Sequence, residues 1–374
     1  MKTTNISVGA LWLSIILAGC EAQTPEATSP SDNTVALAAA KATAPEEEQA
    51  SLAPTESWQG YPWPPDGDLT GTAALSAMLP IPTDKGNACE DYMKLTALEG
   101  EALPYPDLEV TMNPRDKRQD AESDALKKAA SNPEVIKRLE VLRAGAQKAS
   151  CQTFGALYPW VNKGNPLEWK MPQYPAVMMH AAVAEQHAWN LAKAGKLDEA
   201  IAWLHDLIIV GWHLQQDVTL LSNMIGVKIS SDTATSLSML LKTMGTKADT
   251  DTANAWRGYS GLMLWRRHVA YKGLIGKILT THKDDVDTGL PMVIDVARSN
   301  RMMRGVRTEA ILAVALANVV RPGAPPASEL QKKVYKEFMD HPDAGLAAAA
   351  KAFSYILELP QDGRASLALE IAKK

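Results

Sequence analysis

The sequence predicts an all-α protein, a helical bundle or an irregular α-solenoid, preceded by a proline-rich irregular segment and a disordered tether. Three observations predict this class. Apolar residues recur at helical spacing almost continuously after Pro175. Glycine and proline interrupt that pattern where helix ends are expected. No convincing run of alternating apolar and polar residues indicates β-strands.

The clearest helical pattern lies in residues 176–212. We expect a first helix that ends near Ala194, a break at Gly195, and a second helix that begins at Asp198. One face of the second helix carries Leu197, Ile201, Leu204, Ile208 and Trp212. Its other sides are also apolar, which predicts that this helix is central and buried.

The run from Ala188 to Ile201 resembles the turn between the paired helices of a tetratricopeptide repeat, where small residues allow close packing and a glycine ends the first helix. It departs from that family because no proline closes the second helix and no second copy follows at the roughly 34-residue period. The resemblance therefore implies a helical hairpin at residues 176–212 and not a repeat array.

Further helices are expected through the rest of residues 176–374, which we treat as the helical domain. They lie at about 217–244, 252–281, 287–300, 302–320, 327–340, 343–358 and 363–373. Gly245, Pro322, Pro342 and Pro360 separate several of them.

Residues 57–175 are rich in proline and aromatic residues, so only short helices are expected there, because proline fixes φ and removes a backbone donor. The exception is a charged helical stretch from Asp120 to Ser150, which restarts at Pro133. Its apolar face carries Val135, Leu139 and Leu142.

The first 56 residues are read as two segments. Residues 20–56 are rich in Ala, Thr, Pro, Ser and Glu and cannot bury enough apolar surface to offset their ordering entropy, which predicts a flexible tether. Residues 1–19 combine Lys2, an apolar run and small residues, as a secretory signal peptide does. The apolar run has about ten residues, well short of the roughly 20 that span a bilayer as a helix.

Leu17-Ala18-Gly19-Cys20 resembles the lipobox of bacterial lipoproteins. In that family the signal is removed before the cysteine, which carries acyl chains such as palmitate. The resemblance implies that Cys20 becomes the first residue of a membrane-anchored chain, since two or more acyl chains hold firmly. Glu21 stands where an aspartate favours the inner membrane in Gram-negative families, so we expect the outer membrane, with the domain facing the periplasm.

Two further cysteines, Cys89 and Cys151, would reach a compartment where disulfides persist. A bond between them would close a loop of about 60 residues and contribute about 4 kcal/mol in the chain-entropy model. Two separate buried thiols are the alternative. Their spacing is not that of a zinc site, which uses close ligand pairs, and we expect no metal and no cofactor.

The net charge and the absence of known catalytic motifs argue against several classes of function. A formal net charge of −5 gives no indication of a nucleic-acid partner. The chain contains no His-Glu-x-x-His, no Gly-x-Ser-x-Gly and no phosphate-binding glycine loop, so we assign no catalytic residue. A cell-envelope hydrolase remains the alternative, with a carboxylate pair drawn from Glu185, Glu199 and Asp206.

One charge pattern indicates a binding surface. Arginines at successive spacings of three, Arg298, Arg301, Arg304 and Arg307, predict a basic ridge that contacts phosphates, carboxylates or anionic lipid heads. A solvated face paired with nearby acidic residues, such as Asp295 and Glu309, is the other interpretation and the one that the sequence favours. The sequence thus favours a lipid-anchored, non-catalytic helical domain that binds or scaffolds an envelope protein or polymer.

Overall fold

The computed structural model describes residues 56–58, 61–63, 72–105, 119–153, 157–158, 170–244, 247–265, 286–299, 302, 304–316, 328–364 and 366. The fold of this part of the chain is all-α, as predicted, with four very short strands. A contiguous cluster of buried apolar residues extends from Leu75 to Ile356 and so includes both halves of the chain. Within the described residues, no helix is both long and apolar enough to cross a membrane.

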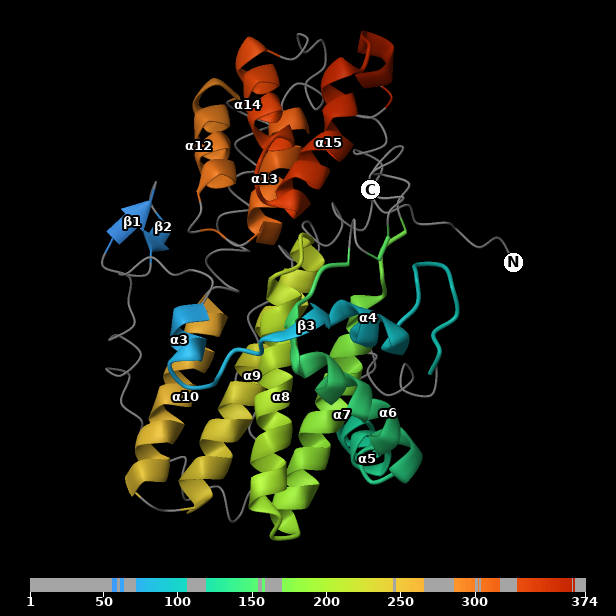
Figure 1. Ribbon diagram of the computed structural model, residues 1–374, viewed down its shortest axis with the longest axis vertical. Helices are drawn as coiled ribbons and strands as arrows, with labels where there is room; N and C mark the ends of the chain where they lie inside the picture. Colours follow the sequence, from blue (N-terminus) through green and yellow to red (C-terminus); the bar gives the residue numbers. More distant parts are fainter. Residues whose placement is uncertain are drawn as a thin grey trace.

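Four long helices lie side by side in the lower part of Figure 1: α7 (Tyr174–Lys193), α8 (Leu197–Gln215), α9 (Leu220–Met244) and α10 (Lys247–Trp265). The predicted hairpin is α7 and α8. Between them Gly195 has φ +79°, a conformation that glycine adopts without strain. Every residue from Leu207 to Gln215 is buried, which confirms that the second helix is central.

α8 and α9 cross at two glycines. A Cβ atom on Gly211 would lie 2.7 Å from the carbonyl oxygen of Gly226, and one on Gly226 would lie 2.5 Å from the carbonyl oxygen of Gly211. Gln215 Nε2 donates to Ser230 Oγ at 3.0 Å beside this crossing. The predicted start of α9 at residue 217 was wrong by three residues, because Gln216 to Thr219 form the turn.

Four shorter helices form a second group, at the top of Figure 1: α12 (Val286–Arg298), α13 (Arg304–Leu316), α14 (Glu329–Met339) and α15 (Ala344–Glu358). A capping box between Ser328 and Gln331 begins α14. Gln331 Nε2 also donates to the carbonyl of Val314 at 2.7 Å, and Tyr335 OH to that of Ile311 at 2.5 Å, so α14 is bonded to α13.

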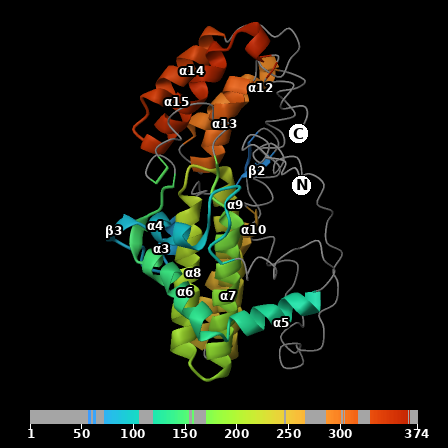
Figure 2. The same cartoon turned by 90° about the vertical axis from the view of Figure 1, so that its right-hand side faces the viewer.

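Two helices precede the long ones and pack against them. α5 (Gln119–Ala129) contacts α7, and α6 (Pro133–Ala146) contacts α7 and α8. Figure 2 shows α5 and α6 on the flank of the four long helices. The predicted apolar face of α6 is confirmed, since Val135, Leu139 and Leu142 are buried.

The short strands were not expected. β1 (Glu56–Trp58) and β2 (Tyr61–Trp63) pair antiparallel, while β3 (Asp84–Asn87) and β4 (Lys148–Ser150) pair parallel. β4 occupies the end of a stretch predicted to be helical up to Ser150. Three short helices lie in the same region: α3 (Thr72–Ser76), α4 (Cys89–Tyr92) and the 3-10 helix η3 (Met93–Leu95).

Candidate functional site at the α8–α9 turn

The turn between α8 and α9 contains a carboxylate, Asp217, that is fully buried. Its Oδ1 accepts from the backbone N–H groups of Thr153 at 3.2 Å and Val218 at 2.9 Å. Its Oδ2 accepts from the hydroxyls of Thr153 at 2.5 Å and Tyr174 at 2.7 Å. Burial and the negative charge of Asp217 raise the pKa of Tyr174 well above its usual value. Four donors therefore occupy the carboxylate, which ties α7 and the Thr153 segment to the turn.

Asn223, in the first turn of α9, extends this network to α13. Its Nδ2 donates to the carbonyl of Asp217 at 2.8 Å, and its Oδ1 accepts from the backbone N–H of Gly305 at 3.1 Å. Glycine is required at residue 305, because a Cβ atom there would lie 2.5 Å from Asn223 Oδ1 and 2.9 Å from the carbonyl oxygen of Thr219. α13 thus lies directly on the start of α9.

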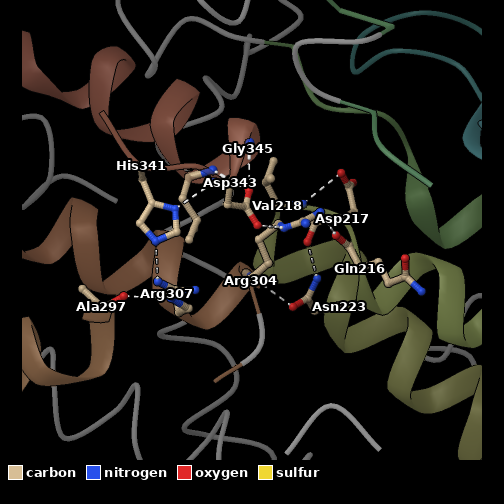
Figure 3. Close-up of polar contacts among 12 residues, drawn as sticks. Gln216, Asp217, Val218, Asn223, Ala297, Arg304, Arg307, His341, Asp343 and Gly345 are labelled. Carbon is tan, nitrogen blue, oxygen red and sulfur yellow. Dashed lines mark hydrogen bonds and ion pairs between the residues drawn. The ribbon is translucent and has the colours of Figure 1, made fainter. Parts of the chain in front are cut away.

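Arg304, the first residue of α13, connects three elements (Figure 3). Its Nε donates to Asp343 Oδ2 at 2.8 Å, and its NH1 donates to the carbonyl of Gln216 at 2.8 Å. Asp343 also begins α15, since its Oδ1 accepts from the backbone N–H groups of Gly345 and Leu346. One guanidinium therefore joins the end of α8, the start of α13 and the start of α15.

A second arginine on α13 is buried beside this contact. Arg307 Nε donates to the carbonyl of Ala297 at 2.8 Å, and its NH2 lies 3.2 Å from His341 Nε2. His341 Nδ1 lies 3.0 Å from the backbone nitrogen of Asp343. Guanidinium and backbone N–H are both donors, whereas a neutral imidazole has one acceptor nitrogen, so His341 accepts from only one of them. Burial lowers the pKa of Arg307, and the charge of Asp343 partly offsets this effect.

Two polar residues that follow on α13 each have a buried side-chain oxygen without a hydrogen-bond partner among the described residues. Glu309 is 6% exposed, and its Oε1 is buried without a hydrogen bond. The hydroxyl of Thr308 is buried in the same way. Burial raises the pKa of Glu309 well above its usual value, so this side chain favours the neutral acid.

The described arginines of the predicted ridge have partners within the protein. Arg298 forms a two-bond ion pair with Glu337 of α14, at 3.0 and 2.6 Å, and Arg304 and Arg307 make the contacts given above. Arg301 lies outside the described residues. The spacing of three does not continue along one helix, because α12 ends at Arg298 and α13 begins at Arg304. Glu337 bonds Arg298 directly, and the charge of Asp295, one of the acidic residues considered in the sequence, also raises the pKa of Arg298.

The structure describes two of the three cysteines for which the sequence predicts a role. Cys89 and Cys151 are joined by a disulfide with a Cα–Cα distance of 4.8 Å, next to the pair of β3 and β4. Cys20, the lipidation residue, lies outside the described residues.

The carboxylates of the hydrolase alternative each have their own partners. Glu185 accepts from Ser236 Oγ at 2.5 Å, Asp206 from Arg143 Nε at 2.8 Å, and Glu199 pairs with Lys196 at the surface. Burial raises the pKa values of Glu185 and Asp206, although these donors oppose the effect. In the described part of the chain, no group of three His, Cys, Asp or Glu residues is placed to hold a metal ion.

Asp217, Asn223 and Gly305 were not singled out from the sequence. The polar Gln-Gln-Asp run that begins with the last residue of the apolar α8 was a usable signal, because such a run in a helix connection indicates a turn whose side chains bond nearby backbone groups. The contact of Gly305 with Asn223 had no such signal.

No family model matches this chain, and neither the curated proteins nor the solved structures contain a significant match. The chemistry of the site therefore rests on its own geometry. The hydrogen bonds of this site hold α7, α9, α13 and α15 in one arrangement. The site therefore acts as a structural junction between these helices.

Proposed function

We propose that this chain is a lipid-anchored protein of the bacterial envelope whose helical body binds or scaffolds an envelope protein or polymer. The observation that carries the proposal is the Leu17-Ala18-Gly19-Cys20 run at the end of a short apolar segment. The disulfide between Cys89 and Cys151 is compatible with an exported protein, because such bonds persist in oxidising compartments.

The form of the helical body supports a binding role. The junction uses the polar groups of Asp217, Asn223 and Arg304 to hold the α12–α15 group on the long helices. With the two groups of helices held together by this junction, the helical body presents a surface of fixed shape to a binding partner. The flexible tether that the sequence predicts at residues 20–56 would have a root-mean-square reach of roughly 30 Å, enough to place that surface away from lipid headgroups.

The anchor is tested by intact mass spectrometry of the protein recovered from native membranes. We expect a chain that begins at Cys20 and carries acyl chains, and a Cys20→Ala variant without acyl mass. An unmodified chain in the soluble fraction would overturn the anchor, and with it the envelope assignment.

The binding role is tested by photo-crosslinking in cells. A photoreactive residue replaces Leu330 on α14 or Met239 on α9, two exposed apolar side chains. We expect an adduct with one defined envelope component from at least one position, which disappears in the Cys20→Ala background. Absence of any adduct from a panel of exposed positions on α7, α9, α14 and α15 counts against the binding class.

A further inference from the structure

Glu309 is an acidic side chain buried where the two helical groups meet. It lies on α13 four residues after Gly305, so both residues occupy the same face of that helix. The backbone N–H of Gly305 donates to Asn223 Oδ1, and a Cβ atom on Gly305 would lie 2.9 Å from the carbonyl oxygen of Thr219. The carboxyl group therefore lies one helical turn from the contact that holds α13 on α9.

Within the part of the chain that the structure describes, no charged side chain forms an ion pair or hydrogen bond with this carboxyl group. α13 packs against α9, α12, α14 and α15. The charged and titratable groups that these elements place around α13 have other partners: Lys228 with Asp232, Arg298 with Glu337, Arg304 with Asp343, Arg307 with His341, and Tyr335 with the carbonyl of Ile311. Of the other charged residues of those four helices, those whose burial the structure describes are exposed.

The ionised form of Glu309 is therefore costly in the closed arrangement. A buried carboxylate without a donor loses its hydration and gains no bond in return, so the site accepts the neutral acid and disfavours the anion. The anion regains hydration only if α13 moves away from its neighbours.

We propose that Glu309 is a proton-sensitive switch at the joint between the helical groups: the neutral acid allows α13 to remain on α9, and ionisation loosens this contact. The direction follows from linkage. The closed state holds one more proton than the open state above the ordinary carboxyl pKa of about 4.3. The stability that the neutral acid contributes to the joint is therefore fully present below that pH and decreases as pH rises toward the raised pKa of Glu309.

The test is hydrogen exchange followed by mass spectrometry on the mature full chain, with rates corrected for intrinsic exchange at each pH. Between about pH 5 and the raised pKa of Glu309, the protection factors of α13 should fall about tenfold per pH unit, as expected for release of one proton. Peptides from the α7–α8 hairpin should not show this slope.

Two variants and one control make the outcome decisive. Glu309→Gln keeps the shape and cannot ionise, so its protection should not depend on pH, and Glu309→Leu should behave in the same way if the amide folds poorly. Glu337→Gln, which removes an exposed carboxylate from α14, should keep the full slope. A flat response in the unmodified chain, the same slope in Glu309→Gln, or an equal slope in the α7–α8 hairpin would each overturn the proposal.

Discussion

Arg304 Nε lies 2.8 Å from Asp343 Oδ2, and this ion pair joins the first residue of α13 to the residue that begins α15. Both side chains are partly buried, with 34% and 21% of their surface exposed. The contact therefore differs from an isolated surface ion pair, because each of the two side chains also makes a second interaction. Arg304 also bonds to the carbonyl of Gln216, and Asp343 caps a helix.

Asp343→Ala removes the ion pair and the cap of α15 together. We expect the free energy of unfolding to fall by about 2 kcal/mol, measured by urea denaturation. Asp343→Asn retains an oxygen for the backbone N–H groups of Gly345 and Leu346, and should cost about 0.5 kcal/mol. An equal loss in both variants would mean that charge, and not capping, dominates at this residue.

Gly305→Ala tests the close approach of α13 to α9. The added methyl group meets Asn223 Oδ1 and the carbonyl of Thr219, so we expect a loss of about 1 to 3 kcal/mol in thermal or urea unfolding. Gly258→Ala on α10 is the matched control. No atom lies within 4 Å of the new methyl group there, and alanine should stabilise that helix by about 0.5 to 1 kcal/mol. Destabilisation by both changes would contradict the interpretation of Gly305.

His213 should make the protein sensitive to acid. It is buried on α8, with Nδ1 at 2.8 Å from Tyr92 OH, and burial lowers its pKa to about 4, an effect that the nearby backbone of Lys148 only partly offsets. The unfolded chain therefore binds a proton at higher pH than the folded one. Stability should be complete above about pH 6.5 and decline by about 3 kcal/mol as pH falls through about 4.

The variant that checks this dependence is His213→Gln, followed by urea unfolding at several pH values. Its free energy of unfolding should change less between about pH 6.5 and about pH 4 than that of the unmodified chain. Tyr92→Phe keeps the buried imidazole and should keep the acid dependence, while it lowers stability at every pH. An unchanged slope in His213→Gln would assign the acid sensitivity to other groups.

The elements that were predicted well depend on neighbours in the sequence. The α7–α8 hairpin follows from apolar residues at helical spacing and from Gly195, and α6 follows from Pro133 and one apolar face. Such signals are local, so a single sequence contains them. The short parallel pair of β3 and β4 is different, because its strands are about 60 residues apart and each has too few residues to show a period.

The junction was missed for the same reason. Gly305 meets Asn223 across 82 residues of sequence, and Arg304 meets Asp343 across 39. The arginine spacing could not show that α12 ends within the series or that Arg307 turns inward to the carbonyl of Ala297. A buried polar contact is defined by its partner, and sequence spacing does not identify a distant partner.

Asp217 gives the sharpest test of the buried network. Asp217→Ala leaves the backbone N–H groups of Thr153 and Val218 without an acceptor. It also strands one of the two hydroxyls, because Thr153 Oγ1 and Tyr174 OH lie 2.8 Å apart and one of them can donate to the other. We therefore expect a loss of about 4 kcal/mol in urea unfolding. Asp217→Asn should cost only about 1 kcal/mol, because its amide oxygen still accepts from the backbone and the hydroxyls of Thr153 and Tyr174 can rotate to accept from its NH2 group. Asp232→Asn, an exposed carboxylate paired with Lys228, is the control and should change stability by about 0.5 kcal/mol or less. A loss in Asp217→Asn as large as that in Asp217→Ala would show that the network needs the negative charge itself, and not only an acceptor.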